Sequence, residues 1–93
     1  IDFEIHLLVD KDEKDKRPYS THEVRLGNIL GWQLIHKEKI MEIDVKIVRT
    51  SFSYKKGNDI IDGAITMSVL EKDYVKGKAI YDNLLNSFRF NVD

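Results

Sequence analysis

Two residues near the middle of the chain, Asp44 and Lys46, have types and spacing suited to metal-assisted chemistry on phosphates. They lie in the segment Glu42-Ile43-Asp44-Val45-Lys46, which alternates charged and apolar residues as a half-buried strand does. Residues two apart on a strand project to the same side of the sheet.

This pair resembles the (D/E)-x-K element of the PD-(D/E)xK nucleases. The resemblance implies that the carboxylate binds Mg²⁺ and that the lysine steadies an attacking water or the scissile phosphate. The resemblance implies an earlier aspartate on a strand, and only Asp2 or Asp10 precedes the pair on an expected strand. Alternating strands often produce the same tripeptide by chance, so the motif is weakly specific outside its structural context. The favoured interpretation of Asp44 and Lys46 is a charged strand face, and a metal-dependent nuclease is the third hypothesis for function.

The other polar residues do not assemble a further catalytic or metal-binding set. The chain has no cysteine, which excludes thiol nucleophiles and cysteine-ligated zinc. The three histidines lack the spacing of metal ligands, the serines lie in no G-x-S-x-G turn, and the glycines form no phosphate-binding loop. Lysines between Asp10 and Asp15 would repel Ca²⁺. We therefore expect a protein that is not an enzyme, with no metal and no cofactor.

A second hypothesis concerns nucleic acid and the expected hairpin region at residues 46–56. Basic residues interleaved with aromatic ones could bind single strands by charge attraction and base stacking. The whole chain, however, has 15 Lys and Arg against 16 Asp and Glu, without the basic excess that phosphate binding usually requires. Nucleic-acid binding is therefore the alternative rather than the favoured function. The residues concerned are Lys46, Arg49, Phe52, Tyr54, Lys55 and Lys56.

The sequence favours contact with another protein. Exposed Trp and Tyr side chains bury a large area at small entropic cost, and a small antiparallel sheet has edges that accept another strand. The candidate binding residues are Trp32, Tyr54, Lys55, Lys56 and Tyr74. We expect a non-catalytic protein-binding or accessory module, with a protein partner or a second copy of the chain.

These side chains must be positioned by one domain over residues 1–93, because a chain of this length has no room for a second core. The longest apolar run, residues 7–9, is too short to cross a bilayer. The chain starts at Ile1 instead of Met. We therefore expect a soluble protein, either cytoplasmic or exported after removal of a leader, or a part of a larger assembly.

Periodicity predicts an α+β fold, with a small antiparallel sheet in the order β-(α)-β-β-α and one or two helices packed on one face. Residues 2–10 alternate as a strand, and residues 10–19 form a charged loop that we expect to be mobile. Alternating runs at 43–54 and 61–69 flank Gly57-Asn58, which predicts a β-hairpin. Residues 74–90 change to helical spacing.

The segment at residues 21–38 has two interpretations. The S-x-x-E sequence at residues 20–23 favours the start of a helix. Gly27 and Gly31 would each cost such a helix about 1 kcal/mol, which a close approach to the sheet could explain. The competing interpretation is two short strands, with one turn near Gly27-Asn28 and another near residues 37–39. We favour the helix because one broad face collects Val24, Leu26, Leu30, Leu34 and Ile35.

Overall fold

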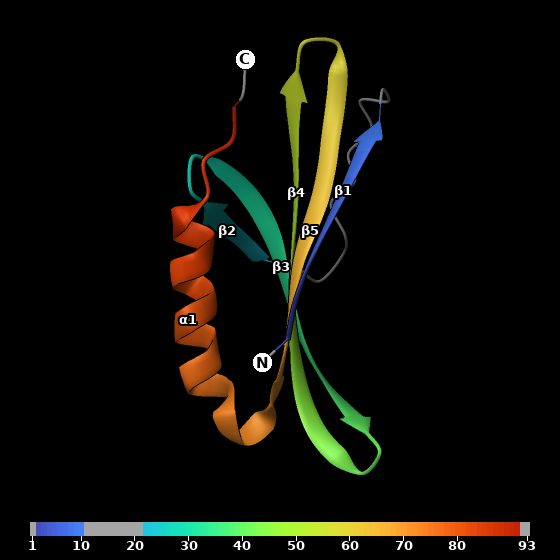
Figure 1. The fold of residues 1–93 in the computed structure, drawn as a ribbon, viewed down its shortest axis with the longest axis vertical. Coiled ribbons are helices and arrows are strands. Elements are labelled where there is room, and N and C mark those ends of the chain that lie inside the picture. Colours follow the sequence, from blue (N-terminus) through green and yellow to red (C-terminus); the bar gives the residue numbers. More distant parts are fainter. Residues whose placement is uncertain (1, 11–21, 92–93) are drawn as a thin grey trace.

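The structure, a computed structural model, describes the backbone of residues 2–10 and 22–91 and the side chains of residues 22–91. These residues form one antiparallel sheet in the strand order β1-β5-β4-β3-β2, followed by a helix, as Figure 1 shows. This confirms the predicted α+β class with an antiparallel sheet. The charged loop predicted at residues 10–19 lies outside the described residues, apart from Asp10. The elements are β1 (Asp2–Asp10), β2 (His22–Leu26), β3 (Ile29–Ile40), β4 (Ile43–Lys56), β5 (Asp59–Leu70), the short 3-10 helix η1 (Glu71–Asp73) and α1 (Tyr74–Ser87).

The helix favoured at residues 21–38 is wrong, because this segment forms β2 and most of β3. A two-residue turn at Gly27-Asn28 joins the two strands, and Gly27 supplies the positive φ of 54° that such a turn requires. Leu26 and Ile29 lie opposite each other across this turn and share one face of the sheet. Because Leu26 and Ile29 are three positions apart in the sequence, this turn interrupts the alternation of apolar residues and produces a spacing that resembles that of a helix. Across residues 2–10 and 22–91, the order of elements is therefore five strands, a short 3-10 helix and then α1, instead of β-(α)-β-β-α.

The other two hairpin turns differ in their chemistry. The turn between β4 and β5 contains Gly57 at a φ of 62°, which confirms the hairpin predicted there. The turn considered near residues 37–39 does not exist, because β3 stays paired with β4 as far as Ile40 opposite Ile43. The chain reverses instead at Met41 and Glu42, which both have positive φ.

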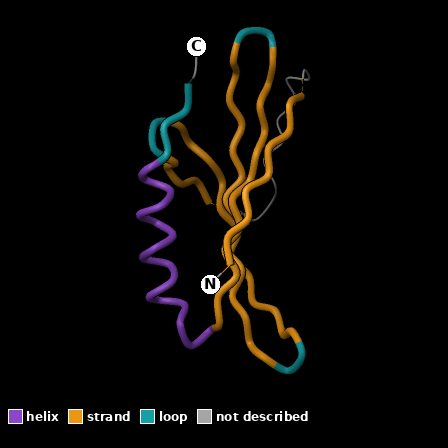
Figure 2. The backbone as a smooth tube through the Cα atoms, in the orientation of Figure 1, coloured by secondary structure: helices purple, strands orange, loops and turns teal. Residues whose placement is uncertain are grey.

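Helix α1 lies along one face of the twisted sheet, as Figures 1 and 2 show. Its buried positions Gly77, Tyr81 and Leu85 recur every four residues, so they form one stripe along the helix. In the described part of the chain, no helix has the length and apolar character that crossing a bilayer requires. Two residues of this buried stripe of α1, Tyr81 and Leu85, belong to the hydrophobic core. The other buried members of the core come from the sheet and are Leu26, Val48, Phe52, Ile65, Met67 and Val69.

A buried chain of hydrogen bonds ties α1 to three strands. The Tyr81 hydroxyl donates to the backbone oxygen of Ile65 over 2.7 Å and bonds to the Thr50 hydroxyl over 2.6 Å. The Gln33 side chain donates to the same Thr50 oxygen over 3.1 Å. When the Thr50 hydroxyl donates to the Tyr81 oxygen, the Tyr81 hydroxyl donates to Ile65 and the Thr50 oxygen accepts from Gln33. Both buried hydroxyl groups are then hydrogen-bonded, as buried polar groups in proteins generally are.

Candidate functional site

The five residues predicted to bind a partner do not form one surface. Trp32 is half-buried and alternates along β3 with Gln33, which faces α1, so Trp32 belongs to the opposite face. Tyr54, Lys55 and Lys56 lie at the far end of β4, where Lys55 is exposed and Tyr54 is half-buried. Tyr74 begins α1, at the other end of the molecule. The structure therefore distributes these residues over three separate places.

The Asp44 and Lys46 side chains each have a partner from their own chain. The Asp44 carboxylate is 3.3 Å from the Lys39 ammonium, and the Lys46 ammonium lies 4.9 Å from the centre of the Tyr74 ring. Among the described residues, no group of three or more His, Asp or Glu is arranged to hold a metal ion. Glu71 lines the same pocket as Asp44, and the earlier aspartates of the nuclease hypothesis, Asp2 and Asp10, lie outside the described side chains.

The basic and aromatic residues of the 46–56 region are divided between the two faces of β4. Phe52 and Tyr54 pack against Phe90, with ring centres 4.9 and 5.2 Å apart, so these rings already contact another aromatic side chain. Arg49 has the opposite parity and lies beside Thr66. Lys56 shares the face of Phe52 and Tyr54, and all three contact residues 90–91, whereas Arg49 and Lys55 lie on the opposite face.

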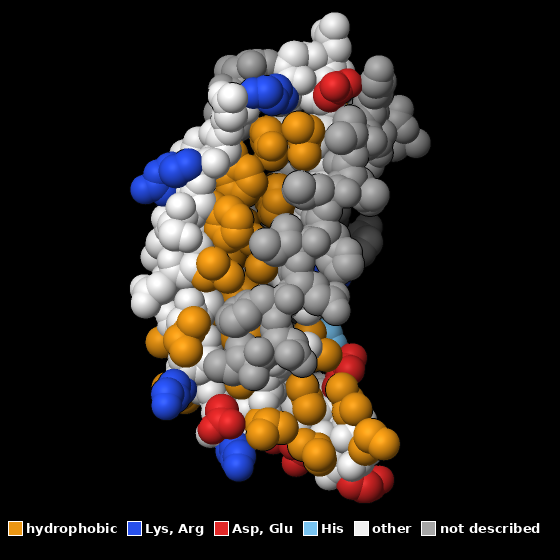
Figure 3. Space-filling model, in the orientation of Figure 1, with side chains coloured by type: hydrophobic (Ala, Val, Ile, Leu, Met, Phe, Trp, Pro, Cys, Tyr) orange, Lys and Arg blue, Asp and Glu red, His pale blue; other side chains and the backbone are white. Residues whose placement is uncertain are grey.

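A different surface stands out at the turn between β3 and β4. It consists of Ile40, Met41, Ile43 and Leu70, whose exposed fractions are 47%, 91%, 52% and 38%. Ile40 pairs with Ile43, and Leu70 pairs with the residue two positions after Ile43, so these three share one face. We call these four residues the apolar end; Figure 3 shows hydrophobic side chains gathered among charged ones at that end of the molecule.

The turn at Met41 and Glu42 has a backbone conformation that neither residue type favours. Met41 has a φ of 49° and Glu42 a φ of 67°, the pattern of a type I′ turn, which is normally occupied by Asn-Gly or Gly-Gly. A residue with a Cβ in this conformation costs roughly 1–2 kcal/mol. Strained, exposed positions occur often at functional sites, where the surrounding structure holds them in place.

The charged residues beside the apolar end are held in ion pairs. Lys37 bonds to Glu71 over 3.2 Å, and Lys39 pairs with Asp44. The hydrogen bond to Glu71, together with the charges of Glu71 and Asp44, raises the pKa of Lys37 above its usual value. These pairs leave Glu42 as an exposed charge directly beside Met41.

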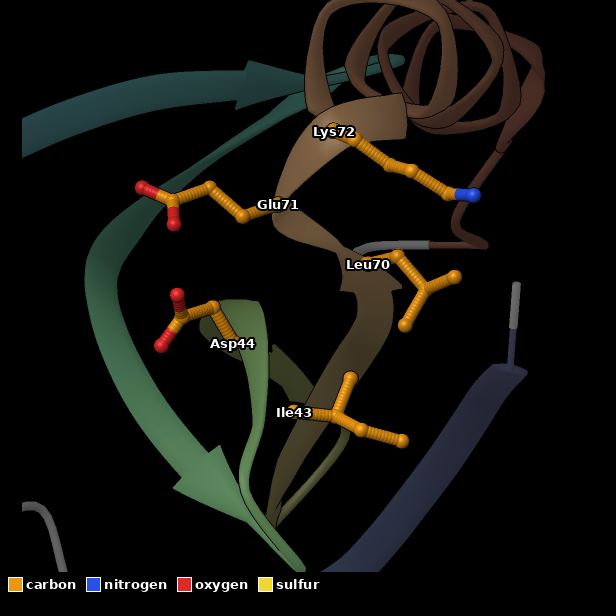
Figure 4. A pocket seen from close by; sticks show the side chains of 5 residues that line it. All are labelled: Ile43, Asp44, Leu70, Glu71 and Lys72. Carbon is orange, nitrogen blue, oxygen red and sulfur yellow. The ribbon is translucent and has the colours of Figure 1, made fainter.

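A pocket of about 580 Å³ opens next to these ion pairs. In Figure 4, the apolar side chains of Ile43 and Leu70 point to one side of it, and the carboxylates of Asp44 and Glu71 point to the other. The lining therefore combines two apolar side chains, two carboxylates and one lysine. Lys72 is the fifth lining residue, and its side chain extends away from both carboxylates.

Sequence reasoning missed the apolar end as a binding surface. The signal was the run Ile40-Met41-Glu42-Ile43, which places three apolar residues in and around a turn that has no glycine, asparagine or proline. Alternation alone assigns Ile43 to a buried strand face, whereas the structure leaves about half of its side chain exposed.

Replacing Met41 and Glu42 together by asparagine and glycine is expected to stabilise the fold by about 1–2 kcal/mol, because Asn-Gly adopts positive φ at little cost. The measurement is the midpoint of urea unfolding. The matched control, Met41→Ala with Glu42→Ala, keeps a Cβ at both positions and should gain nothing. An Asn-Gly variant no more stable than this control would contradict the strain at this turn.

Comparison with known proteins does not extend these observations. No protein-family model matches the chain, and the searches of curated proteins and of solved structures found no match. The contacts, exposure and charges of the described residues are therefore the basis for the function proposed below.

Proposed function

We propose that this protein is a non-catalytic protein-binding module that docks through its apolar end. The observation that carries the proposal is Met41, which is 91% exposed at the tip of a strained turn and has three partly exposed aliphatic neighbours. Single apolar residues on a surface need no explanation, but a cluster at a projecting end is typical of a contact site.

The energetics of the apolar end suit an anchor. Burying one methionine side chain contributes roughly 1.5–3 kcal/mol, and a few such residues dominate most interfaces. Both strands beside the turn are paired in register, so little backbone freedom remains to be lost on binding. The unbranched, polarisable Met41 side chain adapts well to an irregular pocket.

The charges define the complementary surface. Lys37 and Lys39 are already paired with Glu71 and Asp44, whereas Glu42 is an exposed carboxylate beside the anchor. A partner with an apolar pocket for Met41 and a basic residue at its rim would match this end. We expect such a charge pair to affect the association rate more than the affinity.

A photoreactive methionine analogue at position 41 tests the proposal. After cross-linking in an extract of the source cells, the captured protein is purified and its dissociation constant is measured by calorimetry. Met41→Asp should weaken binding at least about tenfold, which corresponds to about 1.4 kcal/mol. The matched control is Val75→Asp on α1, an apolar residue that is 84% exposed and lies outside the apolar end. It should bind as the wild type does.

Two results would contradict this function. One is equal affinity of the Met41→Asp and Val75→Asp variants for the purified partner. The other is a mobility shift with single-stranded DNA or RNA that weakens steeply with salt and is unchanged by Met41→Asp, because it would favour nucleic-acid binding instead.

A further inference from the structure

The chain after α1 forms a short extended tail at the end of the molecule opposite the apolar end. The predicted helix over 74–90 stops at Ser87, and Phe88 is extended, with φ −68° and ψ 146°. We call residues 88–91 the tail. In Figure 1 the tail passes beside the turn between β2 and β3, where Gly27 and Asn28 lie.

Asn28 holds the tail backbone with both ends of its side-chain amide. Its Nδ2 donates to the Phe90 oxygen over 2.8 Å, and its Oδ1 accepts from the Phe90 N–H over 2.7 Å. Lys56 Nζ donates to the Asn91 oxygen over 3.2 Å. An amide that pairs with both backbone groups of one residue imitates a neighbouring strand, so it recognises an extended segment of any sequence.

Aromatic contacts add selectivity for the side chains of the tail. The Phe90 ring lies 4.9 Å from Phe52, 5.2 Å from Tyr54 and 5.8 Å from Phe88, measured between ring centres. Tilted and offset stacked ring pairs at these distances are favourable beyond simple area burial. The rings of Phe52 and Tyr54 therefore match an aromatic residue at the position of Phe90, and Phe88, two positions earlier, stacks on Phe90 and packs against the hydrophobic core.

Gly27 makes the close approach of the tail backbone possible. A Cβ built on Gly27 would lie only 1.7 Å from the Phe88 carbonyl oxygen, and the φ of 54° also favours glycine. A side chain at this position is therefore incompatible with the tail where it lies. Gly27, Asn28, Phe52, Tyr54 and Lys56 together form the surface that contacts the tail, which we call the tail groove.

We infer that the tail groove is a peptide-binding site that takes an extended Phe-x-Phe segment of a partner protein, and that the tail is its resident occupant. The groove contacts with Phe90 and Asn91 come from Asn28, Phe52, Tyr54 and Lys56, which lie far from the tail in sequence. An equivalent segment from another chain could make the same contacts. The groove and the apolar end lie at opposite ends of the molecule, so this inference does not depend on the function proposed above.

Occupation by the tail sets the apparent affinity for a partner segment. A segment from outside binds only when the tail has left, so its affinity is reduced by the fraction of molecules with an open groove. Weakening the tail should therefore strengthen binding of an added peptide. If the tail and the added peptide did not compete for the same surface, weakening the tail would leave the affinity for the peptide unchanged.

Full-length protein and a synthetic peptide with the sequence of residues 87–92 test the inference. The peptide carries fluorescein, and binding is followed by fluorescence anisotropy. Phe90→Ala protein should bind the peptide at least about tenfold more tightly than wild-type protein does, because its own tail no longer fills the aromatic part of the groove. A peptide carrying Phe88→Ala and Phe90→Ala is the matched control and should bind neither protein.

A second variant and a site-specific signal complete the experiment. Circular dichroism shows whether the Phe90→Ala protein is folded; if it is not, Phe90→Leu, which keeps apolar volume, takes its place. Peptide binding should shift the side-chain amide resonance of Asn28. The inference is overturned if a folded variant does not bind the peptide at about 1 mM, or if binding leaves the Asn28 resonance unmoved, since millimolar concentrations are those a tethered tail reaches.

Discussion

Replacing Tyr81 by phenylalanine is expected to destabilise the fold by about 2–3 kcal/mol, because removing one partner leaves other buried polar groups unsatisfied. Without the Tyr81 hydroxyl, the backbone oxygen of Ile65 loses this donor, and the Thr50 hydroxyl keeps only its hydrogen bond from Gln33. A domain of this size has only a few kcal/mol of stability in total. The measurement is the free energy of unfolding by urea. Tyr74→Phe is the control, since Tyr74 is only half-buried and is expected to lose under 0.5 kcal/mol on the same general grounds.

The same hydroxyl predicts how stability changes at high pH. Burial raises the pKa of Tyr81 to about 12, although the hydrogen bond to Thr50 opposes this shift. The unfolded chain has the ordinary tyrosine pKa near 10, so between about pH 10 and 12 the unfolded state ionises first. The contribution of Tyr81 is complete below pH 10 and is lost as the pH rises through this window. Between about pH 10 and 12, the free energy of unfolding of the Tyr81→Phe variant should therefore fall less than that of the wild type. Parallel curves of unfolding free energy against pH for the two proteins would contradict this role of Tyr81.

Replacing Gly31 by alanine is expected to cost about 3 kcal/mol through overpacking. A Cβ at this position would lie 2.4 Å from Leu26 Cδ1 and 2.6 Å from the Ser51 backbone oxygen. Leu26 is fully buried, and Ser51 lies in the middle of β4 in register with both neighbouring strands, so neither can move away easily. The measurement is the free energy of unfolding in urea.

Gly57→Ala separates this steric effect from backbone conformation. Gly57 has a positive φ and no atom within 4 Å of its missing Cβ, so alanine there should cost only about 1 kcal/mol. Equal losses for the two variants would show that the clash at Gly31 is relieved by local movement.

The sequence predicts those parts of the fold whose periodicity is uninterrupted. The strand at residues 2–10 follows from alternation. The hairpin around Gly57 follows from two alternating runs and a glycine turn, although the first run changes parity at Ile47-Val48 while its pairing with both neighbouring strands stays continuous. Residues 22–40 could not be assigned in this way, since the turn at Gly27 shifts the alternation and brings Leu26 and Ile29 to one face. Ile29 and Trp32 do not fit the helical face that favoured a helix here.

The two surfaces discussed above depend on contacts that local sequence does not contain. The apolar end requires a turn at Met41 and Glu42, and neither residue type favours one. The tail groove requires Asn28 to reach Phe90, which is 62 positions away. Alternation indicates which residues share a face of a strand, but it does not indicate which face a later segment will cover.

The connections of the sheet have a consequence for how the chain acquires its structure. Strands β2 to β5 follow one another through two-residue turns, so each can pair with its predecessor as soon as it is made. Among the described strands, β1 in contrast pairs with β5, with Asp2 opposite Ser68, and closing so long a loop is entropically slow. During synthesis, β1 therefore has to wait for β5, whereas each of the strands from β3 to β5 finds its preceding partner already made.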